Sequence, residues 1–155
     1  MAKIPDRLET ALSRLDDMLA ARDQRTHQIL SFHAAIEQQM DVELEALLPN
    51  GSQLRTRLGF SQKIDVLLSA TDNPFMPDLG LALIAFNNLR NCVAHGEPSR
   101  VVDGHLERFR LELARTYLDF NDPEPPTLHE AAAMLVGALA SLSDVEVMIT
   151  LLGWE

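Results

Sequence analysis

The sequence predicts an all-α protein, a single-domain bundle of five or six helices over residues 1–155. Apolar residues recur with the helical period in nearly every segment, and no segment shows the two-residue alternation of a half-buried strand. The chain has only 7 glycines and 8 prolines, which disfavours a turn-rich all-β sandwich. Hydrophobic residues make up 46% of the 155 residues, so the chain can form one sizeable core.

Two helices are predicted before residue 50. The first should begin at Asp6, because Asp6 and Glu9 have the spacing of a capping box. Residues 21–26 lack apolar periodicity and predict a break or an exposed turn, and the second helix should stop at residues 49–51, Pro-Asn-Gly. The apolar stripes of the two helices are Leu8, Leu12, Leu15 and Leu19 in the first, and Ile29, His33, Ile36, Met40, Leu44 and Leu47 in the second.

Three further helices are predicted between residues 61 and 120. Ser61 is expected to cap a short helix that carries apolar residues at 64, 67 and 68. The next helix should run from Asp78 to His95, since Gly96 and Pro98 follow it directly. A helix from about Asp103 carries the stripe Leu106, Phe109, Leu113, Tyr117 and Phe120.

The last predicted helix follows the polar, proline-rich segment NDPEPP at 121–126. Thr127 and Glu130 have the spacing of a capping box, which places the start of this helix. Its apolar stripe contains Leu128, Ala132, Leu135, Leu139, Leu142, Ile149 and Leu152.

Charge and cysteine content restrict the classes of function. The chain has 13 basic and 23 acidic residues and a net charge of -10, which excludes binding of nucleic-acid backbones over a broad surface. Any nucleic-acid contact must therefore be local. One cysteine, Cys92, excludes an internal disulfide, the N-terminus lacks the apolar run of a signal peptide, and the longest apolar stretch (131–140) is about half of a membrane span. We expect a cytoplasmic protein with no membrane association.

The helix predicted over residues 78–95 carries polar residue types that a merely solvated face seldom shows. Asn87, Asn91 and His95 follow one another at four-residue steps, with Asn88 and Arg90 beside them. Asparagine is a poor helix former, so this cluster lowers helix stability and needs another explanation. We expect Leu83 and Ile84 on this same outer side, which suggests contact with a second surface such as another copy of the chain. The opposite, core-facing side is expected to contain Ala82, Ala85, Phe86, Leu89 and Val93.

The segment from Arg90 to His95, RNCVAH, resembles the Arg-x4-6-His signature of HEPN domains, including the polar residue directly after the arginine. HEPN domains are small all-α domains that dimerise so that two Arg/His pairs meet in one cleft. Many are metal-independent endoribonucleases, often in toxin–antitoxin or antiviral systems. The resemblance implies a homodimer that acts on RNA, with a cognate antitoxin as a further partner. It implies Arg90, Asn91 and His95 as catalytic residues. Asn87 and Asn88, which precede the motif on the same helix, are expected to bind the substrate.

Metal-free RNA cleavage suits these residue types and needs neither a metal nor another cofactor. The 2'-hydroxyl attacks the adjacent phosphate, which requires a base, an acid and a cation beside the crowded phosphorane. A histidine titrates near neutrality, and a guanidinium can hold two phosphate oxygens. Since each chain has one histidine in the motif, a twofold dimer would supply one acid and one base, while Asn91 would orient the histidine or the phosphate.

A non-catalytic interpretation remains open. Residues 61–70, SQKIDVLLSA, together with RNCVAHG at 90–96, also resemble the mannitol operon repressor group, helical transcriptional regulators that act through protein contacts. In that case Arg90 and His95 would cap their helix and pair with acidic neighbours, or the protein would be an inactive relative of the nucleases.

Several other residues invite a functional interpretation that we do not favour. Glu37, Asp41 and Glu45 lie at four-residue spacing, but such a face is usually solvated, and we expect no metal site. We expect His33 to be a hydrogen-bonded core residue and Cys92 a packing residue. Residues 52–63 carry three basic side chains and no acid, which permits a local phosphate site; the three are Arg55, Arg57 and Lys63.

Overall fold

The computed structural model of the chain is helical, as predicted, and describes residues 6–20, 24–54, 56–116 and 125–143. No strand occurs within these ranges, and none of the helices in them is long and apolar enough to cross a membrane. The elements are α1 (Asp6–Ala20), α2 (Gln24–Leu47), the 3-10 helix η1 (Gly51–Gln53), α3 (Phe60–Ala70), α4 (Met76–Ala94), α5 (Ser99–Thr116) and α6 (Leu128–Ala140).

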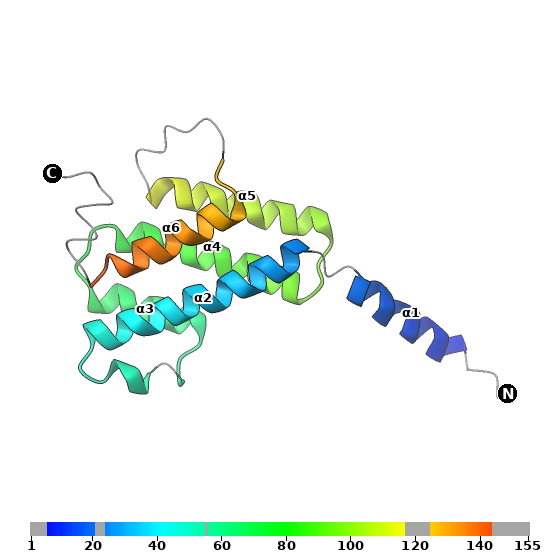
Figure 1. Cartoon of the computed structure of the whole chain (residues 1–155), viewed down its shortest axis with the longest axis horizontal. Helices are drawn as coiled ribbons and strands as arrows, with labels where there is room; N and C mark the ends of the chain where they lie inside the picture. Colours follow the sequence, from blue (N-terminus) through cyan, green and yellow to red (C-terminus); the bar gives the residue numbers. More distant parts are fainter. Residues whose placement is uncertain (1–5, 21–23, 55, 117–124, 144–155) are drawn as a thin grey trace.

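Helix α4 lies at the centre of the bundle and contacts α2, α3, α5 and α6 (Figure 1). Its most extensive contact is with α5, which follows a tight turn and packs antiparallel to α4. Gly96 makes this turn with a φ of 69°, a left-handed conformation that is easily accessible only to glycine. The predicted stop of this helix before Gly96 is therefore confirmed.

The core face predicted for α4 is confirmed, because Ala82, Ala85, Phe86, Leu89 and Val93 are all buried. The ring of Phe86 lies 5.0 Å from the ring of Phe109 on α5, measured between centroids. The prediction that Leu83 projects outward is wrong. Leu83 is fully buried because α2 and α3 also pack against α4, so the buried surface of this helix is wider than one apolar stripe.

The predicted helix ends agree with the structure in part. The capping box before α6 is confirmed, since Thr127 Oγ1 accepts from the Glu130 amide and Glu130 Oε2 accepts from the Thr127 amide. Ser61 does not cap α3. Helix α3 begins at Phe60, and its N-cap is Gly59, whose amide donates to Gln62 Oε1. Helices α4 and α5 begin before the predicted Asp78 and Asp103, at Met76 and Ser99.

The early start of α5 has a local cause at Pro98. The Pro98 carbonyl oxygen accepts hydrogen bonds from the amides of Val101 and Val102, so the first turn closes directly after the proline.

Four residues of the predicted apolar stripes lie outside the described residues, namely Tyr117, Phe120, Ile149 and Leu152.

The predicted stop of α2 is confirmed, and Gly51 explains why the chain turns back closely there. A Cβ atom at Gly51 would lie 1.9 Å from the Leu44 carbonyl oxygen, which is an impossible approach to main-chain atoms. Only glycine therefore allows η1 to lie directly against the end of α2.

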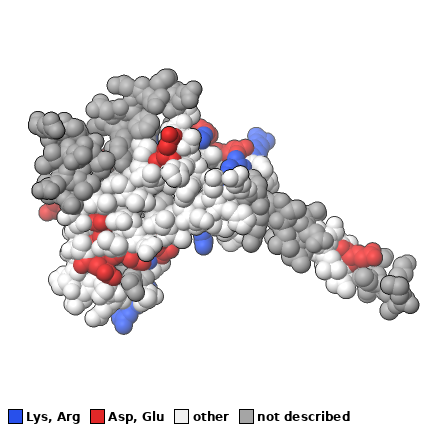
Figure 2. All heavy atoms as spheres, in the orientation of Figure 1, with Lys and Arg blue, Asp and Glu red and all other residues white. Residues whose placement is uncertain are grey.

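Helix α1 extends away from the bundle (Figure 1). Its Leu8 and Leu12 side chains are 48% and 46% exposed, so this part of the predicted apolar stripe is not covered by the bundle. On the face drawn in Figure 2, acidic and basic side chains of the described residues lie in small separate groups, without one continuous basic area.

Candidate functional site

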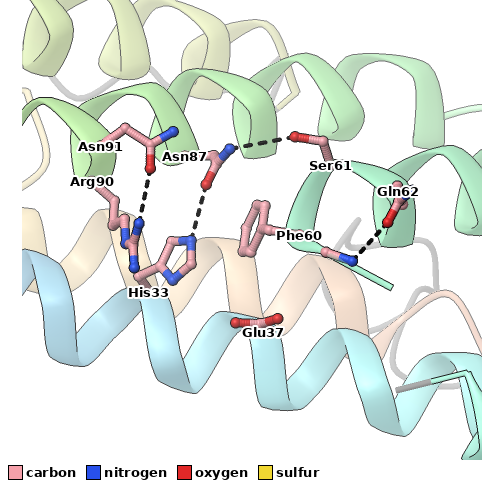
Figure 3. Close-up of a pocket in the computed structure, with 9 residues that line it drawn as sticks. His33, Glu37, Phe60, Ser61, Gln62, Asn87, Arg90 and Asn91 are labelled. Carbon is pink, nitrogen blue, oxygen red and sulfur yellow. Dashed lines mark hydrogen bonds between the residues drawn. The ribbon is translucent and has the colours of Figure 1, made fainter. Parts of the chain in front are cut away.

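A cavity of about 410 Å³ opens between α2, α3 and α4, and it contains part of the predicted site (Figure 3). Its walls combine an arginine, a histidine, a carboxylate, three side-chain amides and a hydroxyl group. The lining residues are His33 and Glu37 from α2, Gly59, Phe60, Ser61 and Gln62 at the start of α3, and Asn87, Arg90 and Asn91 from α4.

The structure brings together three of the five predicted site residues. Asn87, Arg90 and Asn91 line the cavity, since they occupy the part of α4 that faces α2 and α3. Asn88 is exposed on another side of α4 and does not line the cavity. His95 caps the C-terminal end of α4, where its backbone amide donates to the Asn91 carbonyl oxygen and its side chain is exposed outside the cavity.

Asn88 and His95 instead follow an exposed line on α4 that begins with two large apolar residues. Leu81 and Ile84 are 47% and 41% exposed, and at 100° per residue they lie within about 60° of Asn88 and His95 around the helix axis. The predicted outward position of Ile84 is confirmed. This line lies next to the side of α4 that lines the cavity, since at 100° per residue Asn91 is only about 20° from Ile84 around the helix axis.

His33 also lines the cavity, although the sequence predicted only a core position for it. It is buried and hydrogen-bonded, as predicted: Nε2 lies 3.1 Å from Asn87 Oδ1, and the ring stacks on Phe60 with centroids 4.3 Å apart. Within the cavity it lies beside Arg90. One signal for this role was available, because a histidine interrupts an otherwise apolar stripe on α2. Phe60, Ser61 and Gln62 gave no such signal.

The surroundings of His33 favour its neutral form. Burial lowers the pKa of His33 below its usual 6.5, the hydrogen bond with Asn87 partly opposes this, and the positive charge of Arg90 lowers the pKa further. An amide oxygen can only accept, so the orientation of Asn87 places the ring proton on Nε2. The other ring nitrogen, Nδ1, has no hydrogen-bond partner among the described residues and is unprotonated in this tautomer.

The low pKa of His33 predicts a pH dependence of stability. The unfolded chain binds the proton more readily, so His33 stabilises the fold above pH 6.5, and this contribution is lost as the pH falls through the folded-state pKa. We expect the melting temperature of the wild type to fall more steeply between pH 7 and pH 5 than that of His33→Gln. His27→Gln, on the exposed side of α2, is the control. Equal slopes in His33→Gln and the wild type would contradict this account.

The side-chain amide oxygens of Asn91, Gln62 and Asn87 all accept hydrogen bonds within the protein. Asn91 Oδ1 accepts from Arg90 Nη1 at 2.9 Å, and Gln62 Oε1 accepts from the Gly59 amide at 2.9 Å. Because the guanidinium and the backbone amide can only donate, these two orientations are fixed by chemistry. Asn87 Oδ1 is likewise occupied by His33. Besides the Glu37 carboxylate, whose Oε1 is paired with Lys63, and the unprotonated Nδ1 of His33, the side-chain groups left to the cavity are chiefly donors: the Arg90 guanidinium and the amide groups of Asn91 and Gln62. These donors match an oxyanion.

Arg90 is the cation of this cavity that lacks a carboxylate partner among the described residues. Its guanidinium donates to Asn91 Oδ1, whereas most arginines of α5 are held by acidic side chains. Arg108 and Arg115 both bind the buried carboxylate of Glu112, and Arg110 binds Glu107. A half-buried guanidinium without an anion is able to bind one from outside the protein.

Lys63, in the basic segment 52–63, is not available to bind an anion in the cavity, because two carboxylates already pair with it. The Lys63 side chain is 3% exposed, and its Nζ lies 2.8 Å from both Glu37 Oε1 and Asp41 Oδ1. Burial alone would lower the pKa of Lys63, but the hydrogen bonds to Asp41 and Glu37 outweigh burial and raise it above its usual value. Glu37 and Asp41 are therefore ion-pair partners rather than a merely solvated face, and Arg55 lies outside the described residues.

Cys92 is buried against the core, as predicted for a packing residue. Burial, with a smaller effect of Glu97, raises the pKa of its thiol, which disfavours the reactive thiolate. No group of three histidine, cysteine, aspartate or glutamate side chains suited to hold a metal ion occurs in the part of the chain that the structure describes.

No protein-family model matches the sequence, and neither the curated proteins nor the solved structures include a significant match.

Proposed function

We propose that this protein is a metal-independent endoribonuclease of the HEPN type that acts as a homodimer, as the toxic or antiviral member of a pair with a separate protein inhibitor. One observation carries the proposal: Arg90, without a carboxylate partner among the described residues, lies in a cavity where the amide groups of Asn91 and Gln62 can also donate hydrogen bonds. Such a site suits the negative charge that builds up on a phosphate during transesterification. It also contains the Arg and Asn of the motif.

In this proposal Arg90 binds the scissile phosphate through its planar fork, and the free Asn91 amide group donates a further hydrogen bond. Asn87 fixes the His33 ring at the side of the same cavity. His95, which is exposed at the end of α4, transfers a proton during cleavage. Substrate binding by Asn88 requires an RNA strand that extends out of the cavity across α4.

The exposed line of Leu81, Ile84, Asn88 and His95 supports the dimer in this proposal. Two large apolar side chains next to polar ones are typical of a surface that contacts another protein. A twofold contact centred on Leu81 and Ile84 would bring two α4 helices together and leave Asn88 and His95 accessible at the edge of the interface. The motif histidines would then enter the site only in the assembled dimer.

The direct test is cleavage of single-stranded RNA and transfer RNA by purified protein in EDTA. We expect the wild type to cut at least one of these substrates and His95→Ala to lose about 10²–10⁴-fold in rate, the usual contribution of general acid–base catalysis. The matched control is His105→Ala on α5. Light scattering on the same sample should show a dimer. An intact RNA panel, or a monomer at tens of micromolar protein, would contradict the proposal.

A second candidate is a non-catalytic regulatory protein of the mannitol operon repressor kind. The exposed Leu8 and Leu12 of α1, a helix that extends from the bundle, favour this alternative because they offer a surface for another protein. The position of His95 outside the cavity favours it too. Binding of a protein partner that is abolished by Leu8→Glu, with no cleavage of RNA, would support the second candidate over the first.

A further inference from the structure

The two histidines associated with the site differ in position and environment. His33 lies in the wall of the cavity, beside the guanidinium of Arg90, and it is buried. His95 is exposed at the C-terminal end of α4, outside the cavity. Two titratable groups in such different surroundings are suited to opposite roles in acid–base chemistry.

We propose that His33 is the general base of this site and that His95 is the general acid. This inference rests on the ribonuclease function proposed above. Because His33 lines the cavity in which Arg90 would hold the phosphate, its imidazole would contact the bound substrate and act as a catalytic residue. The motif alone assigns proton transfer to His95 and gives His33 no role.

The contacts of His33 hold it in the form that a base requires. Asn87 accepts the Nε2 proton, while its own amide group is directed at Ser61 Oγ at 3.4 Å, and Phe60 stacks on the ring. This arrangement fixes the tautomer and the ring plane and leaves Nδ1 to accept a proton. The charged groups nearest the ring are Arg90 from α4, Glu37 from α2 and Lys63 from α3, and burial with the two cations favours neutral imidazole at pH 7.

The reaction balances with these two groups. The substrate 2'-hydroxyl gives its proton to the unprotonated nitrogen of His33, and the 2'-oxygen forms a bond to phosphorus. The bond from phosphorus to the 5'-oxygen breaks, and this oxygen takes a proton from His95, which enters the site in the proposed dimer. The products are a 2',3'-cyclic phosphate and a 5'-hydroxyl, and solvent restores the two histidines to their starting forms.

The test compares two substrates that differ in the leaving group. Single-stranded RNA releases an alkoxide that needs a proton, whereas uridine 3'-(4-nitrophenyl phosphate) releases a stable phenolate that does not. We expect His33→Asn to lose about 10²–10⁴-fold in kcat/KM on both substrates, because each requires the base. His95→Asn should lose activity on RNA and retain most of it on the aryl ester. His27→Asn, exposed on α2, is the control that should match the wild type.

The pH profiles give a readout that a merely structural role would not change. The wild-type kcat/KM should fall on the acid side as His33 becomes protonated, and this limb should be absent from the residual activity of His33→Asn. Added imidazole should restore part of the activity of His33→Ala and none to Arg90→Ala. Full activity of His33→Asn on RNA would overturn the role of His33 and leave the ribonuclease proposal in place.

A measurement on the wild type covers the case in which the His33 variants do not fold. In an NMR titration, bound uridine 3'-monophosphate should raise the pKa of His33, because the phosphate adds negative charge beside the ring. An unchanged titration of His33 at saturating nucleotide would overturn the inference. Failure of the wild type to cleave any RNA would overturn the ribonuclease proposal and the role of His33 together.

Discussion

Replacement of Arg90 by alanine is expected to reduce RNA cleavage by about 10²–10³-fold, the usual effect of removing a group that stabilises transition-state charge. Stability should change little, because Arg90 is half-buried and its hydrogen bond within the described residues is to its neighbour Asn91. Single-turnover rates and melting temperatures on the same samples separate the two effects.

Arg90→Lys sharpens this prediction. Lysine keeps the charge but loses the planar fork that holds two phosphate oxygens, so it should restore little of the activity. Arg108→Ala is the matched control, since Arg108 is an exposed arginine whose partner Glu112 keeps Arg115. Near-normal cleavage by Arg90→Ala would remove the cavity from the proposed mechanism.

Replacement of Lys63 by alanine should have the largest effect on stability, a loss of about 3 kcal/mol in the free energy of unfolding, because it leaves two carboxylates without their buried cation. Lys63 connects α3 to Glu37 and Asp41 on α2. The same contact holds the start of α3, and therefore Phe60, at the edge of the cavity. Urea unfolding followed by circular dichroism measures the loss.

Two controls test whether the missing charge partner causes this loss. The triple variant Lys63→Met, Glu37→Gln, Asp41→Asn removes all three charges together and should recover most of the stability. Arg25→Ala breaks an exposed ion pair with Asp103 and should cost less than about 1 kcal/mol. If Lys63→Ala is no more destabilising than Arg25→Ala, the buried ion pair does not hold α3 on α2.

Local sequence patterns predicted the elements of this fold where a short-range cause dominates. The capping box of Thr127 and Glu130 and the left-handed turn at Gly96 depend on neighbouring residues, and both are present. The start of α5 was misplaced, because the Pro98 carbonyl closes a helical turn without the apolar periodicity that marks a core-facing segment. Leu83 was misplaced because periodicity describes one buried stripe, whereas α4 is covered on several sides.

The candidate site was only partly predictable for a similar reason. The spacing of Asn87 and Asn91 places them on one side of a helix, and both line the cavity in the structure. His33 is 54 positions away from Asn87 in the sequence, so their contact depends on how α2 packs against α4. The pairing of Lys63 with acidic residues of α2 has the same origin. Neither contact follows from a local motif.

Analysis of the RNA product ends tests the central claim most directly. Cleavage in EDTA should leave a 2',3'-cyclic phosphate and a 5'-hydroxyl, and a single 2'-deoxynucleotide on the 5' side of the cut should abolish cleavage at that position, because the nucleophile is missing. Mass spectrometry distinguishes these ends. Products with a 5'-phosphate, or undiminished cutting next to the 2'-deoxynucleotide, would contradict metal-independent transesterification at Arg90.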